Sequence, residues 1–343
     1  MDNTLINFAS DNSSAVHPVV LERLSTVNSG AVSSYGNDIY TEEAIKRCKL
    51  EFGTGALALS VFNGTGANTI ALDIMADKYS MVLVPAGSHL ISDECGAPAR
   101  ATGCDIAIVT EEPRKLTPND LLPFMQLKGN IHKSQPKIVA IAQLTERGEA
   151  YSLDELKALR DFCDEHHLFL YIDGARLANA TVALGSTLSD AAFGADIFSL
   201  GGTKNGFMAV ETLIIRNLRL AGVAPYIRKQ LAQLASKMRY LSAQVLAMFE
   251  GELWRANAAH ANKMMQLLYE GIKDVSGIAV ERVPSGNMMF VNMPEKLAEH
   301  LLKTFYFYVE KISADSDCAR FVTSWDTKVA DVEHLIAELK ASA

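Results

Sequence analysis

The sequence predicts an α/β protein with a mostly parallel, seven-stranded sheet sandwiched by helices and a small α+β domain at its C-terminal end. Short apolar runs alternate with helical patterns, which is typical of parallel strands that are buried on both faces. Seven such runs occur, at 56–62, 81–84, 106–109, 138–144, 168–172, 197–200 and 212–215. A chain of 343 residues is longer than a single hydrophobic core usually accommodates, so two domains are expected. We therefore expect an N-terminal segment with a large domain over 1–250, and a small domain over 251–343.

Before the first strand, residues 1–45 are expected to be irregular apart from one short helix. It opens at His17-Pro18, because proline is favoured near a first helical position. A second helix is expected to start with Thr41 as its N-cap and to end near Gly53. Later helical patterns lie at 65–79 and 153–166, and two long ones at 225–249 and 252–273. The remaining chain reads as short strands and helices at 278–283, 287–292, 294–305, 307–312, 320–324 and from 329.

Composition and charge restrict the classes of partner. The chain is 49% apolar and 21% charged, as is usual for a globular protein. Its net charge of −8, without a basic tract, argues against nucleic acid or an anionic membrane as the main partner. No run of about 18 apolar residues occurs, so no transmembrane helix is expected. Residues 1–4 lack the basic start of a signal peptide.

The five cysteines have no C-x-x-C spacing, and four lie in ordinary apolar or helical context. We expect free, buried thiols in a reducing cytoplasm. No cluster of histidine, cysteine and aspartate has metal-ligand spacing, so no metal is expected.

Asp173 and Lys204 each follow an apolar run, at the strand ends where α/β sheets bind ligands. Asp173 ends one strand, and Lys204 lies just past another in a turn that is too rich in glycine for a helix. This pair suits pyridoxal phosphate, because the lysine forms a Schiff base with the aldehyde and the carboxylate keeps the ring nitrogen protonated. Singly, such an aspartate more often caps a helix, and such a lysine is more often solvated. The pair therefore needs a phosphate site and a carboxylate site elsewhere in the chain.

Residues 61–68 supply the candidate phosphate site. The Gly64-Thr65-Gly66 turn lets backbone N–H groups approach an anion at a helix N-terminus, and the Thr65 hydroxyl can donate. A plain βα turn explains this motif at least as well. It is not a complete G-x-G-x-x-G motif, and Asp73 follows too soon to contact a ribose, so a dinucleotide fits less well.

Three further residues are candidates that are weaker when taken alone. His89 follows the second strand, where an imidazole could stack on the cofactor ring and move protons, although a surface role is more common. Arg320 is expected at a strand start, where it could bind a carboxylate in a bidentate fork or form a surface salt bridge. Ser10 on its own is only a turn residue.

Taken together, these motifs resemble the low-specificity threonine aldolases of the β-eliminating lyase group, which are fold-type-I pyridoxal phosphate enzymes. The resemblance extends from about residue 7 to the end. The motifs are Ser10-Asp11-Asn12, 35–40 (Tyr-Gly-Asn-Asp-Ile-Tyr), 63–68 (Asn-Gly-Thr-Gly-Ala-Asn), Ser88-His89, 173–179 (Asp-Gly-Ala-Arg-Leu-Ala-Asn), 199–206 (Ser-Leu-Gly-Gly-Thr-Lys-Asn-Gly) and 320–323 (Arg-Phe-Val-Thr).

The resemblance implies a role for each matched residue. Lys204 would carry the cofactor and Asp173 would pair with its ring nitrogen. Arg176 would contact the 3′ oxygen of the cofactor, and His89 would stack on its ring. Gly64 and Thr65 would bind its phosphate, together with Thr203 or Ser199. A second phosphate-binding cation is expected within 228–237.

The resemblance also implies a substrate site and an oligomer. Ser10 and Arg320, with Arg176, would bind the carboxylate of a small amino-acid substrate, and Tyr40 would enter from a neighbouring subunit. The chain would then form a homo-oligomer with shared sites, most simply a dimer of dimers, although dimer and tetramer both stay open.

Two departures from the family pattern affect the mechanism. Many family members have Thr-His-Asn after the fourth strand, whereas this chain has Thr145-Glu146-Arg147, so Glu146 replaces the second active-site histidine. The base could be His89, Glu146 or a water between them. The turn around Lys204 reads Gly-Gly-Thr-Lys-Asn-Gly, where other members have Ser-Lys-Gly. The chain therefore resembles a sub-branch of the family, and the resemblance does not specify which aldehyde the reaction releases.

The expected activity is cleavage of L-threonine or L-allo-threonine to glycine and acetaldehyde. A pyridoxal-dependent β- or γ-eliminating lyase, of the cysteine or tyrosine lyase type, stays open as the alternative. A non-catalytic binding module is a third class, which the intact pair of Lys204 and Asp173 disfavours.

Overall fold

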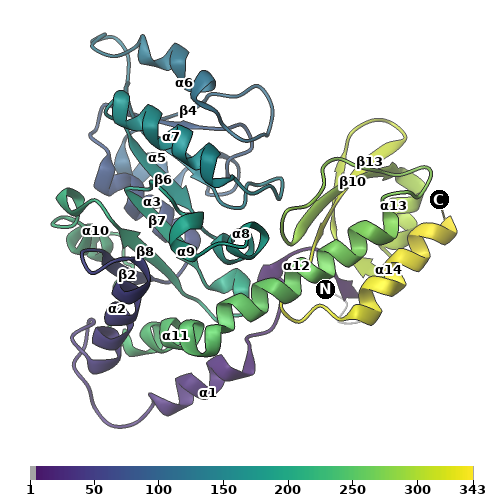
Figure 1. Ribbon diagram of the computed structural model, residues 1–343, viewed down its shortest axis with the longest axis horizontal. Coiled ribbons are helices and arrows are strands. Elements are labelled where there is room, and N and C mark those ends of the chain that lie inside the picture. The colour runs from purple at the N-terminus through teal and green to yellow at the C-terminus, as the bar shows by residue number, and fades with distance from the viewer. Residues whose placement is uncertain (1–4, 343) are drawn as a thin grey trace.

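A central sheet and a smaller second sheet organise the computed structural model, which describes residues 5–342 (Figure 1). The signal-peptide expectation concerns residues 1–4, which lie outside this range. The large sheet has the order β2-β8-β7-β6-β5-β3-β4. Its strands are β2 (Leu57–Val61), β3 (Ser80–Val84), β4 (Asp105–Ile108), β5 (Gln135–Ala142), β6 (Phe169–Asp173), β7 (Ile197–Gly201) and β8 (Glu211–Ile215).

All seven predicted strands are present, and the mostly parallel sheet is confirmed. Strands β4, β3, β5, β6 and β7 run parallel, whereas β8 is antiparallel to both β7 and β2. The strands from β5 to β7 end side by side, so the polar residues that follow them gather at one edge of the sheet.

Helices cover both faces of this sheet. One face packs against α2 (Ile39–Phe52), α7 (Leu153–Glu165), α8 (Leu177–Leu184), α9 (Leu188–Ala191) and α11 (Arg239–Phe249). The other packs against α3 (Gly64–Met75) and α10 (Ala224–Gln230), and α5 (Ala97–Thr102) lies against α3. The remaining helices of this part are α1 (Pro18–Thr26), α4 (His89–Ser92) and α6 (Pro118–Met125).

A four-stranded antiparallel sheet of order β12-β13-β10-β9 forms the small part. Helix α12 (Leu253–Ile272) runs into it from the large part (Figure 1), and Trp254 packs in the large core whereas Met264 packs in the small one. The predicted boundary at 250/251 stays a prediction. The elements are β9 (Ala279–Val280), β10 (Met288–Pro294), α13 (Glu295–Leu301), β11 (Phe305–Tyr306), β12 (Tyr308–Lys311), β13 (Ser316–Val322) and α14 (Val329–Ser342).

The N-terminal segment is more ordered than predicted. Strand β1 (Ile6–Asn7) pairs in parallel with β11, and Phe8 is fully buried in the small core. This pairing carries Ser10 and the single turn η1 (Asp11–Ser13) to the edge of the large sheet, where η1 contacts the turn that holds Lys204.

Several expectations about local structure were wrong. The helix predicted over 225–249 is divided into α10 and α11, because Gln233 in the break accepts the N–H of Phe62 and Ala232 has a positive φ of 59°. The N-cap of α2 is Asp38, whose carboxylate accepts the N–H of Thr41. Arg320 lies inside β13 rather than at a strand start.

All five cysteines are free, but Cys95 is exposed, in contrast to the expectation of buried thiols. Among residues 5–342, no helix combines the length and the apolar character that crossing a bilayer requires.

Candidate active site

Two adjoining cavities open at the carboxyl ends of β5, β6 and β7. The inner one is lined by Asp173 and Gly64, the outer one by Ser10 and Arg320, and His89, Glu146, Arg176 and Lys204 line both. The structure therefore brings together most of the residues that the sequence singled out.

Asp173 is held at the end of β6 by two hydrogen bonds. Its Oδ1 accepts the N–H of Ala175 at 2.9 Å, and its Oδ2 accepts from Asn68 Nδ2 at 3.0 Å. Asn68, on α3, also accepts from the hydroxyl of buried Tyr171 at 2.6 Å. Each carboxylate oxygen keeps a free lone pair, so Asp173 can still accept a proton donor from a ring nitrogen.

Lys204 lies in the single turn η2 (Thr203–Asn205), directly after β7. This turn passes close to the loop after β6: a Cβ on Gly201 would collide with the carbonyl of Ala175, so glycine is required there. Burial, together with the positive charge of Arg176, lowers the pKa of Lys204. A lysine with a lowered pKa is more often the neutral amine that attacks an aldehyde.

Arg176 is anchored by an acid that the sequence did not single out. Asp11 is fully buried and accepts from Arg176 Nε at 2.7 Å and Nη2 at 2.9 Å, and also from Asn287 Nδ2 at 3.0 Å. Burial acts to raise the pKa of Asp11, but Arg176 and Lys204 outweigh it and lower the pKa. Two of the guanidinium donors are thus used within the protein, which limits Arg176 as a fork for a substrate.

Arg320 has unused hydrogen-bonding capacity at the outer cavity. Its guanidinium stacks on Tyr308 at 4.7 Å and donates from Nη2 to the carbonyl of Ala9 at 3.1 Å. Its buried Nε has no hydrogen-bond partner among the described residues. Burial lowers the pKa of Arg320, and a partly desolvated arginine with a free donor is suited to bind a carboxylate beside Ser10.

His89 and Glu146 meet where the cavities join. His89 begins α4 rather than lying in a loop, and its N–H donates to Glu146 Oε1 at 2.9 Å. Its Nδ1 lies 2.8 Å from the buried Glu94, and this hydrogen bond raises the pKa of His89. Burial raises the pKa of Glu146. Glu94 could not be chosen from the sequence, because its contact with His89 depends on the helical turn between the two residues.

The predicted phosphate residues are divided between two places. Gly64 lines the inner cavity, whereas Thr65 lines the adjacent hollow beside α5. Asn63 caps α3 through Gly66, and the N–H groups of Gly64 and Thr65 have no partner among the described residues. These two N–H groups at a helix N-terminus suit an anion.

Below the lysine turn, two buried atoms are also unpartnered within residues 5–342: Thr203 Oγ1 and Glu211 Oε2. Ser199 accepts the N–H of Gly174 at 2.8 Å and does not line either cavity. No cation within 228–237 lines these cavities in the described chain, so that expectation stays a prediction.

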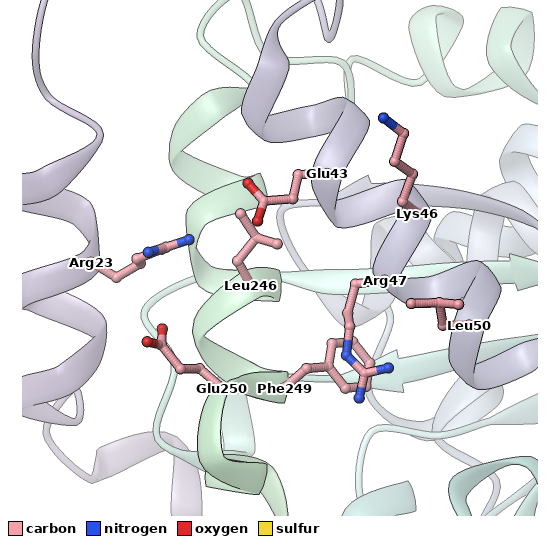
Figure 2. A pocket seen from close by; sticks show the side chains of 8 residues that line it. All are labelled: Arg23, Glu43, Lys46, Arg47, Leu50, Leu246, Phe249 and Glu250. Carbon is pink, nitrogen blue, oxygen red and sulfur yellow. The ribbon is translucent and has the colours of Figure 1, made fainter.

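Another hollow lies between α1, α2 and α11 (Figure 2). Arg23 and Glu250 reach toward it from α1 and the end of α11, and Arg47 stacks on Phe249 at 4.7 Å. None of the predicted site residues lines it, so the chemistry is placed at the sheet edge instead.

Comparison with known proteins identifies the family. The β-eliminating lyase family model matches residues 7–295, which is most of the chain. The chain belongs to the β-eliminating lyase family. Within this family it is 37% identical to the low-specificity L-threonine aldolase of a Pseudomonas species, over 97% of both chains. It is 34% identical to that of Pseudomonas aeruginosa, over 97% of this chain and 96% of the relative.

A solved structure supports the same grouping. Threonine aldolase from Leishmania major is 29% identical and superposes with a TM-score of 0.93, covering 98% of this chain and 99% of that one. The resemblance to threonine aldolases and the predicted fold-type-I architecture are therefore confirmed.

Pyridoxal phosphate is the cofactor of this lyase family, and the residues present fit it. Lys204 has a free, partly desolvated amine, Asp173 faces the same cavity, and the N–H groups of Gly64 and Thr65 suit its phosphate. The structure has the lysine, the acid and the anion site that the cofactor requires, on three different elements.

Proposed function

We propose that this protein cleaves L-threonine, L-allo-threonine or both to glycine and acetaldehyde. One observation carries the proposal: Lys204 and Arg320 face connected cavities, with His89 and Glu146 at the junction. Bound pyridoxal phosphate supplies an electron-withdrawing ring that stabilises charge on the substrate α-carbon. The protein must hold the substrate and move protons around it.

Arg320 fixes the substrate carboxylate, with Ser10 beside it in the outer cavity. The hydrogen bond to the Ala9 carbonyl and the stacking on Tyr308 hold the guanidinium of Arg320 in one orientation. Arg176, two of whose donors are bound to Asp11, contributes positive charge to the same cavity rather than a second complete fork.

In this proposal Glu146 takes the proton from the substrate β-hydroxyl, and the imidazole of His89 would stack on the bound cofactor. Glu94 restrains the His89 ring, whereas Glu146 accepts a backbone N–H from His89 through Oε1 and keeps lone pairs free. A carboxylate with a raised pKa binds a proton more strongly, which makes it a better base near neutral pH.

The test is to measure acetaldehyde and pyruvate from threonine, serine and cysteine with cofactor-loaded protein. Acetaldehyde from threonine supports the aldolase. Pyruvate from serine or cysteine without acetaldehyde would instead assign the alternative β-eliminating activity. A protein that binds no cofactor would be a binding module.

We also propose a homo-oligomer with shared sites, at least a dimer, acting on a small amino acid in the cytoplasm. Tyr40 lies on the first turn of α2 and does not line the Lys204 cavities in the described chain. Near it, Tyr35 and Ile39 are exposed apolar residues, 47% and 66% accessible, as expected of a surface that contacts a partner.

A further inference from the structure

The turn that carries Glu146 is fastened to the small sheet beside the arginine proposed to bind substrate. We propose that Arg147 is a positioning residue that sets the place of Glu146 relative to Arg320. This inference rests on the proposed role of Glu146 at the substrate β-carbon.

One face of the small sheet presents a row of side chains. Phe290 on β10 and Tyr308 on β12 are both directly opposite Arg320 on β13, so the three side chains emerge on the same face. Glu281, just after β9, donates its N–H to the carbonyl of Phe290 at 3.0 Å and thus extends the row. Cross-strand pairing fixes the spacing along this row.

Two arginines stack on aromatic rings of this row: Arg320, which belongs to the row, and Arg147, which comes from the turn that carries Glu146. Arg320 lies over the Tyr308 ring at 4.7 Å, and Arg147 lies over the Phe290 ring at 4.4 Å. Arg147 Nη1 is also 3.8 Å from Glu281 Oε2, with side chains only 24% and 25% exposed. Partial desolvation strengthens both the stacking and the ion pair relative to a fully exposed contact.

The turn between Thr145 and Glu149 transmits this anchoring to Glu146. The N–H of Thr145 donates to the carbonyl of Glu149 at 2.9 Å, and the N–H of Gly148 to the carbonyl of Thr145 at 2.9 Å. The Thr145 hydroxyl oxygen accepts the N–H groups of Arg147 and Glu149 at 3.3 and 3.1 Å. Glu146 directly precedes Arg147 inside this hydrogen-bonded turn, so the anchoring of Arg147 acts on the position of Glu146 across a single peptide bond.

A second ion pair anchors the far end of this turn, at Glu149, which is three residues from Glu146. Arg282 Nη1 is 2.9 Å from Glu149 Oε2, and the N–H of Ser285 donates to the carbonyl of Gly148 at 3.2 Å. Arg282 therefore offers a matched control: it is an arginine from the same interface with an ion pair to the same turn.

The experiment compares Arg147→Met, Arg147→Lys and Arg282→Met in the cofactor-loaded full-length protein. Methionine keeps the apolar stem and volume, which protects folding, whereas lysine restores the charge toward Glu281. We expect Arg147→Met to lower kcat for threonine about ten- to a hundredfold, as for a base displaced by a fraction of an ångström to an ångström. KM should change little because Arg320 is untouched, and the ratio of threonine to allo-threonine rates should shift.

Four further readouts separate a positioning role from general damage to the protein. Arg147→Lys should recover most of kcat, Arg282→Met should keep the wild-type ratio, and cofactor affinity by absorbance titration should be unchanged throughout. Exchange of the glycine α-proton, which needs no β-carbon chemistry, should stay at the wild-type rate in Arg147→Met.

Wild-type kcat and ratio in Arg147→Met would overturn the inference. So would equal losses in Arg282→Met, no recovery in Arg147→Lys, or a parallel loss of glycine exchange or cofactor affinity. Failure of the proposed function is seen separately, as wild-type protein that releases no acetaldehyde. The variants are then compared on the β-substituted amino acid that the wild type converts.

Discussion

Glu211 should make the stability of the cofactor-free protein depend on pH in a way that Glu211→Gln removes. Glu211 is the first residue of β8, opposite Gly201 on β7, and is 4% exposed. Its Oε1 accepts the N–H of Thr203 at 3.4 Å, and its Oε2 has no hydrogen-bond partner in the described chain. Burial raises its pKa from the usual 4.5 to about 7. A shift of this size corresponds to about 3 kcal/mol between the protonation states.

The sign follows from proton binding in the two states. Below pH 4.5 the carboxyl is protonated in both folded and unfolded chains and contributes no difference. Between 4.5 and about 7 only the unfolded chain loses the proton, so the free energy of unfolding falls as pH rises. Above about pH 7 the folded chain also loses the proton, and the free energy of unfolding does not fall further through this group. Glutamine does not titrate, so the variant gains stability relative to wild type across this window, by up to about 3 kcal/mol.

The pH dependence can be measured by urea unfolding of the cofactor-free protein from pH 4.5 to 8. The experiment compares wild type, Glu211→Gln and a control at an exposed site, Glu299→Gln. The difference in midpoint between Glu211→Gln and wild type should widen up to about pH 7 and then stay constant, whereas Glu299, on the surface of α13, should give no such window. Parallel midpoints at all pH values for Glu211→Gln would refute the reasoning.

The remaining predictions concern the site itself. Lys204→Ala should abolish both turnover and the absorbance band of covalently bound cofactor, and a variant that keeps both would assign the lysine role elsewhere. Glu146→Gln should change the ratio of threonine to allo-threonine rates; an unchanged ratio at an unchanged rate would mean that Glu146 is only a polar wall. Mixing Lys204→Ala with an inactive Tyr40→Ala chain should restore activity after subunit exchange, because one site of the hybrid is intact; demonstrated exchange without recovery would contradict a shared site.

The large sheet could be predicted because each strand is a short apolar run that is buried on both faces. The direction of β8 could not, since an antiparallel strand at this position has the same pattern as a parallel one. The break before α11 also had no local signal. It depends on Gln233 binding Phe62, a contact across 171 positions, which local helix propensity does not report.

At the site, the locations of Asp173, Lys204 and His89 could be predicted because Asp173 ends a strand and the other two lie within a few residues after one. Asp11 and Glu211 were not. Asp11 reaches Arg176 only because β1 pairs with β11, and Glu211 reads locally as a polar residue at the start of a strand. Such partners depend on contacts between distant parts of the chain.

The pairing of β1 with β11 joins residues 6 and 305, almost the two extremes of the chain. During synthesis from the N-terminus, Phe8 therefore has no partner until nearly all of the protein has left the ribosome, although the segment from β2 to β8 can already fold. Ser10 and Asp11 take their places only when this late contact forms. The turn that holds Lys204 can therefore form early, whereas the outer cavity beside Ser10, where we propose that the substrate binds, is completed last, so incomplete chains are expected to lack this cavity.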